Sequence, residues 1–400
     1  MEPLLSAKGN DITLWRAATD FAAEYRKSLL DLAASDPDGS SESVIEEASA
    51  TVETLLQAHQ TLRQQLHCLI EEMSTALPHH RKELTGAFYG SLYRHFGLFH
   101  SATAFYQLSM DFLRTASNAI VAHVISQLGT DARHLPELAL IAVGPAGRCE
   151  YSPFCPLQIL LVHTEVTPEQ FPTFNRFCEA LHAGFEEGGF PIDPEITPLN
   201  PDWRGTLSEW RHRCKTEEES INLCRLIDQF PLCSGSKLGF ELKQLSNAAL
   251  QENIFALTNL VHRMAALSNG LGFMGRLKLE RNGLFQLLNH GLMPLSAALS
   301  ALALIRNNPD SSVYERIHAL LKQNKLDVEL AERILATWHR LHDLRLWREQ
   351  SFHIDEHTDH SLSIDPNELT AEQRHALKET LESVAIIQHH VEIIFSGMGE

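Results

Sequence analysis

The sequence of 400 residues lacks several features that would assign it quickly to a class of protein. Its seven cysteines are scattered and contain no Cys-x-x-Cys pair, so we expect reduced thiols rather than a disulfide framework or a zinc site. No stretch approaches the roughly 18 consecutive apolar residues of a transmembrane helix. The start, Met1-Glu2-Pro3, lacks the basic residues and apolar core of a secretory signal. We therefore expect a cytoplasmic protein without a membrane partner.

The chain is also poor in positive charge. It has 33 Lys and Arg against 51 Asp and Glu, which gives a formal net charge of -18, and no dense basic run offsets this. A phosphate backbone is repelled by such a balance, so the composition predicts that nucleic acid is not a partner. The hydrophobic share of 44% is ordinary for a globular protein, and the length is sufficient for two or three domains.

The first third of the sequence predicts helices. One is expected near 12–33, and a longer one begins near Ser43, which has Glu46 at the spacing of a capping box. Apolar residues then recur at steps of three and four, and we expect Pro78 to end this helix. A further periodic stretch predicts a helix over 101–128.

The pattern changes at Leu138. The short apolar run Leu138–Val143 predicts a buried strand, the segment Gly144–Gly147 predicts a tight connection, and Leu157–Val162 predicts a second strand. A helix is expected over 168–187. Further strands are expected near 194–199 and 224–232.

The rest of the chain predicts a helical region. The expected helices are 241–268, 290–306, 312–323, 328–350 and 370–396. The predicted fold class is therefore α+β and mostly helical. A small α/β domain over 131–240 lies between an N-terminal helical region, 1–130, and a C-terminal helical bundle, 241–400.

One motif carries a resemblance to a known family. The segment Gly144-Pro-Ala-Gly147-Arg148-Cys-Glu150 lies between the two predicted strands. It resembles the Gly-Ser-x-Gly-Arg-x-Glu loop of the nucleotidyltransferases related to protein-PII uridylyltransferase. In that family the next strand begins with Asp-x-Asp. Two carboxylates at this spacing face the same side of a strand, where they hold the Mg²⁺ that bridges the nucleotide phosphates.

This sequence departs from the family pattern at its chemistry. The two aspartate positions are Pro156 and Gln158, and the serine of the loop is Pro145, which also lacks a backbone donor. The third acidic residue of the family is kept as Asp228, but Phe230 stands where arginine is usual.

The resemblance covers about 105–400, and the first hundred residues have no counterpart in it. Further matching segments are Asn200-Pro201-Asp202-Trp203 with Trp210, Leu271-Gly272-Phe273 at an expected helix start, and Gly291-Leu-Met-Pro294. Charged family positions in the C-terminal region are again replaced, at Leu288, Ala297 and Ser300. Packing positions are thus retained while charges are lost.

The resemblance with these losses implies a non-catalytic regulatory or signalling protein without a catalytic or metal-binding residue. The remnant of a nucleotide site would be Gly144, Gly147, Arg148, Glu150 and Asp228. Arg148 could contact a phosphate, but we favour pairing of its guanidinium with Glu150 or Asp228.

Two alternatives stay open. In the first, the protein is an active nucleotidyltransferase that uses Mg²⁺ and a nucleotide triphosphate, with Glu150, Asp228 and either Asp202 or Asp193 forming a substitute metal site. In the second, it is a nucleotide sensor without turnover. Otherwise no cofactor is expected. The expected partner is an unidentified protein, with a PII-like signalling protein as the candidate, and the helical regions could form a homo-oligomer.

The histidine-rich segment 353–360 contains imidazoles and carboxylates at spacings that suit a divalent metal. It falls in a predicted loop without periodicity. We therefore favour a solvated polar loop.

Overall fold

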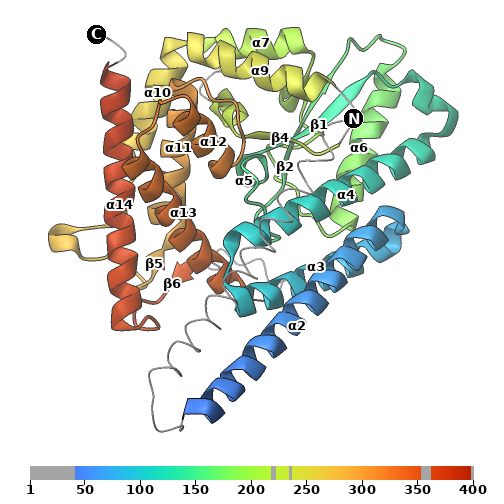
Figure 1. Ribbon diagram of the computed structural model, residues 1–400. Helices are drawn as coiled ribbons and strands as arrows, with labels where there is room; N and C mark the ends of the chain where they lie inside the picture. The colour runs from blue at the N-terminus through green and yellow to red at the C-terminus, as the bar shows by residue number, and fades with distance from the viewer. Residues whose placement is uncertain (1–40, 218–221, 234–236, 353–361, 398–400) are drawn as a thin grey trace. The chain divides into compact units, whose positions relative to one another are not determined.

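The computed structural model describes residues 41–217, 222–233, 237–352 and 362–397 (Figure 1). The chain divides into two compact units, residues 1–68 and 69–400. Helix α2, Ser41–Thr75, supplies the described part of the first unit, and Ser43 lies inside it. The helix predicted near 12–33 and the segment 353–360 lie outside the described residues. The second unit is mostly helical with a small mixed sheet, so the predicted fold class is confirmed.

Two aromatic-rich helices precede the sheet. The sequence predicted that Pro78 ends α2, but this helix already ends at Thr75. Pro78 lies instead in the first turn of α3, Pro78–Phe99, where a helix needs no N–H donor. Helix α4, Ala102–Leu128, agrees with the predicted 101–128. The rings of Phe88 in α3 and Phe112 in α4 stack with centroids 3.9 Å apart, which joins the two helices.

The sheet has the strand order β3-β2-β1-β4. Strand β1, Leu138–Val143, lies antiparallel to β2, Gln158–His163, and to β4, Gln229–Pro231, while β2 pairs in parallel with the short β3, Arg204–Gly205. The first two strands confirm the predicted 138–143 and 157–162. Val143 is opposite Gln158 on one side and Gln229 on the other.

The strand predicted over 194–199 is wrong, and the one over 224–232 is mostly wrong. The carboxylate of Asp193 accepts from the backbone N–H groups of Glu195 and Ile196, both at 2.9 Å, and this local turn uses donors that a ladder would need. In the other segment only Gln229–Pro231 is a strand, because Cys224–Ile227 forms a 3-10 turn.

Three helices complete the sheet region: α6, Phe171–Glu187; α7, Leu207–Lys215; and α9, Lys237–Glu252. Helix α9 packs against β1, β2 and β4. A Cβ on Gly239 would lie 2.9 Å from Ile141, so the missing side chain allows the helix to approach the sheet. Short 3-10 turns cover Gly129–His134, Pro201–Trp203 and Phe273–Gly275.

The C-terminal helices form a bundle (Figure 1). They are α10, Ile254–Ala266; α11, Met293–Ile305; α12, Val313–Lys322; α13, Val328–Glu349; and α14, Ala371–Ser396. The single helix predicted over 241–268 is therefore two helices, α9 and α10. They separate at Asn253, whose side chain caps α10 by accepting from the N–H of Ala256 at 3.1 Å.

A π-helical turn, Leu288–Leu292, leads directly into α11. Pro294, in the first turn of α11, has no backbone N–H to donate to a carbonyl of the preceding turn. The stretch Leu288–Ile305 is long and apolar enough to cross a membrane by composition, but 72% of it is buried inside the protein. It is therefore accounted for as a core helix. Strands β5, Phe285–Gln286, and β6, Ser363–Ile364, form a separate two-stranded pair beside it.

We expect Gly147→Ala to lower the free energy of unfolding. An added Cβ would lie 2.0 Å from the carbonyl oxygen of Asp228, so the loop and β4 would have to separate, at a cost on the order of 3 kcal/mol. Chemical denaturation measures the change. The matched control is Gly86→Ala in α3, where a Cβ meets nothing within 4 Å and stability should rise by about 0.5–1 kcal/mol. Equal effects of the two substitutions would contradict this account.

Candidate functional site

The loop after β1 begins with one helical turn, α5, Gly144–Gly147. Gly144 has a φ of 63°, in the left-handed region, and a Cβ there would lie 2.4 Å from the side-chain oxygen of Gln158. Gly147 touches the backbone of Asp228 even more closely. Both glycines therefore have a packing reason that is independent of any phosphate.

Arg148 follows this turn and joins two carboxylates. Its Nε donates to Glu150 at 2.8 Å, and its Nη1 donates to Asp228 at 3.1 Å. Both acids are buried, with exposed fractions of 3% and 6%. The predicted pairing of Arg148 is confirmed, and it involves both acids rather than one.

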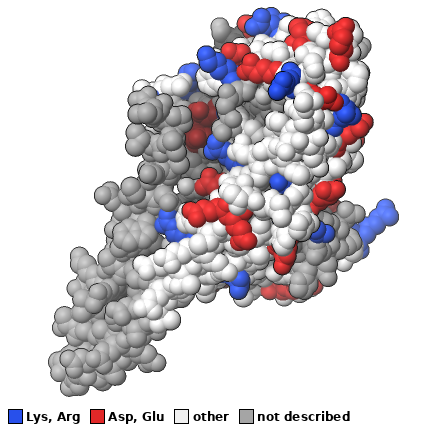
Figure 2. All heavy atoms as spheres, turned by 90° about the vertical axis from the view of Figure 1, so that its right-hand side faces the viewer, with Lys and Arg blue, Asp and Glu red and all other residues white. Residues whose placement is uncertain are grey.

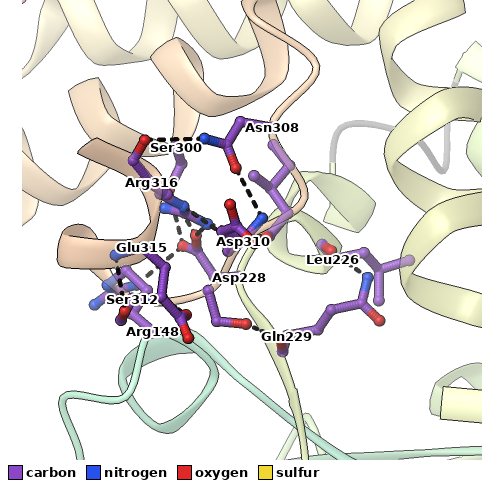
Figure 3. A network of polar contacts seen from close by, with 12 residues as sticks. Arg148, Leu226, Asp228, Gln229, Ser300, Asn308, Asp310, Ser312, Glu315 and Arg316 are labelled. Carbon is purple, nitrogen blue, oxygen red and sulfur yellow. Dashed lines mark hydrogen bonds and ion pairs between the residues drawn. The ribbon is translucent and has the colours of Figure 1, made fainter. Parts of the chain in front are cut away.

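The carboxylate of Asp228 also accepts from the C-terminal bundle (Figure 3). Ser300 of α11 donates to Oδ1 and Oδ2 at 3.0 and 2.8 Å, and Arg316 of α12 donates to Oδ1 at 2.8 Å. Arg316 further donates to the backbone oxygens of Ile227 and Asp310. Two guanidinium groups and a hydroxyl thus surround this carboxylate.

Glu150 is held in the same way from helix α13. Its Oε1 accepts from the indole N–H of Trp338 at 2.8 Å, and Nε2 of His342 lies 3.6 Å from the same oxygen. Arg345, one turn further along α13, donates to the backbone oxygen of Glu150 at 3.3 Å. Glu150 therefore fixes the loop after β1 to α13.

The electrostatics follow from this arrangement. Burial alone would raise the pKa of Glu150, but Arg148 and the donors around the carboxylate lower it to about 2. Burial lowers the pKa of His342 to about 3, so this imidazole is neutral at pH 7. Burial also opposes the charge of Arg148, but Glu150 and Asp228 outweigh it and raise the pKa of the guanidinium. Glu150 is thus a carboxylate and Arg148 a cation across the physiological range.

A second buried polar cluster lies beside Glu150. Arg345 donates to Glu349 at 2.7 Å and to the hydroxyl of Ser152 at 2.7 Å, and the hydroxyl of Tyr93 donates to Glu349 at 2.8 Å. This cluster joins α3, the loop and α13. The thiol of Cys155 lies 2.9 Å from Arg345, yet burial raises its pKa. Burial likewise raises the pKa of Cys149 to about 12, so neither thiol is activated as a nucleophile.

Pro156 and Gln158, the two positions at which the resemblance predicts aspartates, lie next to this site. Pro156 is exposed at the end of the loop, and the amide of Gln158 donates to Asp193 at 2.9 Å. Asp193 is thereby engaged in its own turn, and Asp202 is exposed on a separate 3-10 turn. Among the described residues, no group of three or more His, Cys, Asp or Glu is placed to hold a metal ion.

A pocket of about 590 Å³ opens above Arg148, Glu150 and Asp228. One side is formed by the loop after β1 and the other by α10, the π-helical turn and α11. Apolar side chains of Leu260, Leu288 and Leu292 contribute to its wall. Arg225 and Arg263 also line it; both are exposed, and neither forms an ion pair within the described ranges.

Two family models match the chain. One is described as "Putative nucleotidyltransferase DUF294" and matches residues 97–221, and the other is described as "Putative nucleotidyltransferase substrate binding domain" and matches residues 255–395. No curated protein matches the chain. The two matches support a nucleotidyltransferase family for residues 97–221 and 255–395.

The two matched regions meet at the site. Arg148 and Glu150 lie in the first, Ser300, Arg316 and Trp338 lie in the second, and Asp228 lies between them. All five residues proposed from the sequence as a nucleotide-site remnant are brought together. Sequence reasoning missed Arg316 and Trp338, because they are ordinary helix residues whose role depends on tertiary contact.

The depressed pKa values predict a stability that falls in acid. In the unfolded chain the imidazole of His342 has a pKa of 6.5 and the carboxyl group of Glu150 has a pKa of 4.5. In the folded chain these pKa values are about 3 and about 2. The unfolded state therefore holds more protons between these values, and the free energy of unfolding falls as pH drops.

Glu150→Gln should reduce stability at pH 7 and remove the part of the fall that lies between about pH 4.5 and 2. Urea denaturation over a pH series measures this. The control is Glu329→Gln, since the side chain of Glu329 is 86% exposed and its loss should leave the profile unchanged. An unaltered profile for Glu150→Gln would refute the assignment.

Proposed function

We propose that this protein is a non-catalytic regulatory or signalling protein that keeps the nucleotidyltransferase fold as a scaffold. One observation carries the proposal: the Arg148 guanidinium is the cation between Glu150 and Asp228. A metal site in the same place would need both carboxylates as free ligands. Here each is already neutralised by an internal charge.

The residues at this position do not fit Mg²⁺. The ion needs oxygen ligands in near-octahedral geometry. Pro156 offers no side-chain oxygen, Gln158 is turned to Asp193, and both oxygens of Asp228 accept from protein donors. We therefore derive no phosphoryl-transfer step through a metal ion.

The proposal predicts no nucleotidyl transfer. The purified chain with Mg²⁺ or Mn²⁺ and each nucleoside triphosphate should release no pyrophosphate above background, with or without a PII-like acceptor protein. Pyrophosphate release that disappears in Asp228→Ala but persists in Glu329→Ala would establish the active alternative instead. Glu329 is a suitable control because its side chain is 86% exposed and belongs to none of the proposed sites.

A nucleotide sensor without turnover is the second candidate, and the pocket favours it. Its volume lies within the range of about 300–1,000 Å³ that is usual for ligand sites. Arg225 and Arg263 offer two exposed guanidinium groups that could bind a phosphate bidentately. The apolar wall would contact a base or sugar.

A thermal-shift titration tests this candidate. A ligand that binds only the folded state at about 100 times its Kd stabilises it by about 2.7 kcal/mol. If the protein is a sensor, one nucleotide should raise the melting temperature, and Arg263→Ala should reduce that shift while Arg176→Ala, an exposed arginine of α6, should not. The absence of a shift with every nucleotide would eliminate the sensor.

For its setting we propose the cytoplasm and a protein partner, either PII-like or a second copy of the chain. On the face drawn in Figure 2, basic and acidic side chains are interspersed rather than gathered into a broad basic stripe. This distribution and the net charge of -18 support a partner other than nucleic acid.

A further inference from the structure

A hairpin of residues 270–284 projects from the bundle between α10 and β5. It is the pale orange loop that extends beyond α14 in Figure 1. The backbone bonds from Gly272 to Arg276, at 2.7 Å, and from Lys278 to Gly270, at 2.8 Å, close its outer part. The resemblance predicted a helix start at Leu271-Gly272-Phe273, but the structure has only the single turn Phe273–Gly275. We call residues 270–284 the arm.

The tip of the arm presents two apolar side chains to solvent. Phe273 is 88% exposed and Met274 is 80% exposed, the highest values among the large apolar residues of the described chain. Met274 also has a φ of 58°, in the left-handed region that a side chain rarely adopts. The turn closed by the bond from the N–H of Gly275 to the oxygen of Gly272, at 3.2 Å, accounts for this conformation. The described residues leave both side chains uncovered, and a partner that receives the tip would bury them.

The arm is also basic on an acidic protein. Arg276, Lys278 and Arg281 are exposed, and none forms an ion pair within the described ranges. Glu280 is its one acidic residue, 3.8 Å from His290. The chemistry of the arm therefore suits an acidic surface with an apolar patch.

The outward face of α14 has this character. Glu379 and Glu382 are exposed on it, one helical turn apart, and Ile386 and Ile393 follow along the same face with exposed fractions of 37% and 55%. Glu379 lies 4.0 Å from Arg340 and 3.3 Å from His375, and both pairs are solvent-exposed. Such pairs hold little energy and can rearrange.

The arm and α14 lie on one side of the bundle. The amide of Gln388 in α14 donates to the backbone oxygens of Met264 and Leu267, at 2.8 and 3.2 Å. These two residues lie at the end of α10, shortly before the arm begins. The arm does not cover the outward face of α14 in its own chain, because the arm extends away from the bundle and its tip is exposed. In a pair of molecules related by a two-fold axis, however, each arm can reach the α14 face of the other.

We propose that the protein forms a symmetric dimer in which the arm of each copy seats Phe273 and Met274 near Ile386 and Ile393 of the other. Lys278 and Arg281 then face Glu379 and Glu382. The contact is reciprocal, so it closes after two copies. An anionic membrane suits the arm less well, because the net charge of -18 repels such a surface. This dimer is independent of whether the pocket binds a nucleotide.

Sedimentation velocity of the full chain, from about 1 to about 100 µM, tests the proposal by mass action. The wild-type chain should form a dimer. The double variant Phe273→Ser, Met274→Ser should raise the dimer Kd at least about tenfold. Phe171→Ser is the matched control, because Phe171 is 55% exposed on α6, away from both surfaces, and its dimer Kd should be unchanged.

Charge exchange makes the test specific to this pairing. One chain carries Lys278→Glu with Arg281→Glu, and a second carries Glu379→Lys with Glu382→Lys. Each alone should be monomeric, because like charges face one another in its homodimer. An equimolar mixture should form a heterodimer, because both reciprocal contacts are then complementary.

Three results would overturn the proposal: a wild-type chain that is monomeric throughout the range, a tip variant with the wild-type Kd, or charge-reversed chains that do not combine. Thermal melting of each variant checks folding. All six substituted positions are exposed, so melting temperatures near that of the wild type are expected.

Discussion

The bridge that Arg148 makes between Glu150 and Asp228 is the constraint on which the rest of the site depends. Two carboxylates are buried there, and an isolated buried charge would cost several kcal/mol. Each acid must therefore collect donors, and the donors come from different elements: Arg148 from the loop after β1, Ser300 and Arg316 from α11 and α12, and Trp338 from α13. Satisfying two charges thus joins the sheet to the C-terminal bundle.

The same bridge gives the loop after β1 a structural role that does not depend on a metal ion. The two glycines remain necessary because the loop approaches Gln158 and the backbone of Asp228 closely. The arginine and the two acids remain necessary because they satisfy one another. Retention of the loop is therefore compatible with the proposed non-catalytic role, since packing and charge pairing preserve it.

The fold was predictable where local pattern and tertiary environment agree. The buried runs of β1 and β2 and the capped helices α12 and α14 appear close to their predicted positions. The pattern failed where side chains redirect the backbone. Asp193 satisfies a turn in place of a strand, and Asn253 divides one periodic stretch into two helices. Helix α3 escaped prediction because three glycines and an aromatic-rich face obscure its period.

Residue identity and short-range spacing were sufficient to predict the α+β class and to single out the loop with Arg148 and Glu150, together with Asp228. Only the folded chain shows that the guanidinium of Arg148 pairs with both Glu150 and Asp228. It also shows that Arg316 donates to Asp228 and Trp338 donates to Glu150. The tertiary structure also decided that Phe273 and Met274 stand uncovered at the end of an arm. Those features depend on residues separated by tens to hundreds of positions, and only the packing of the folded chain brings such residues together.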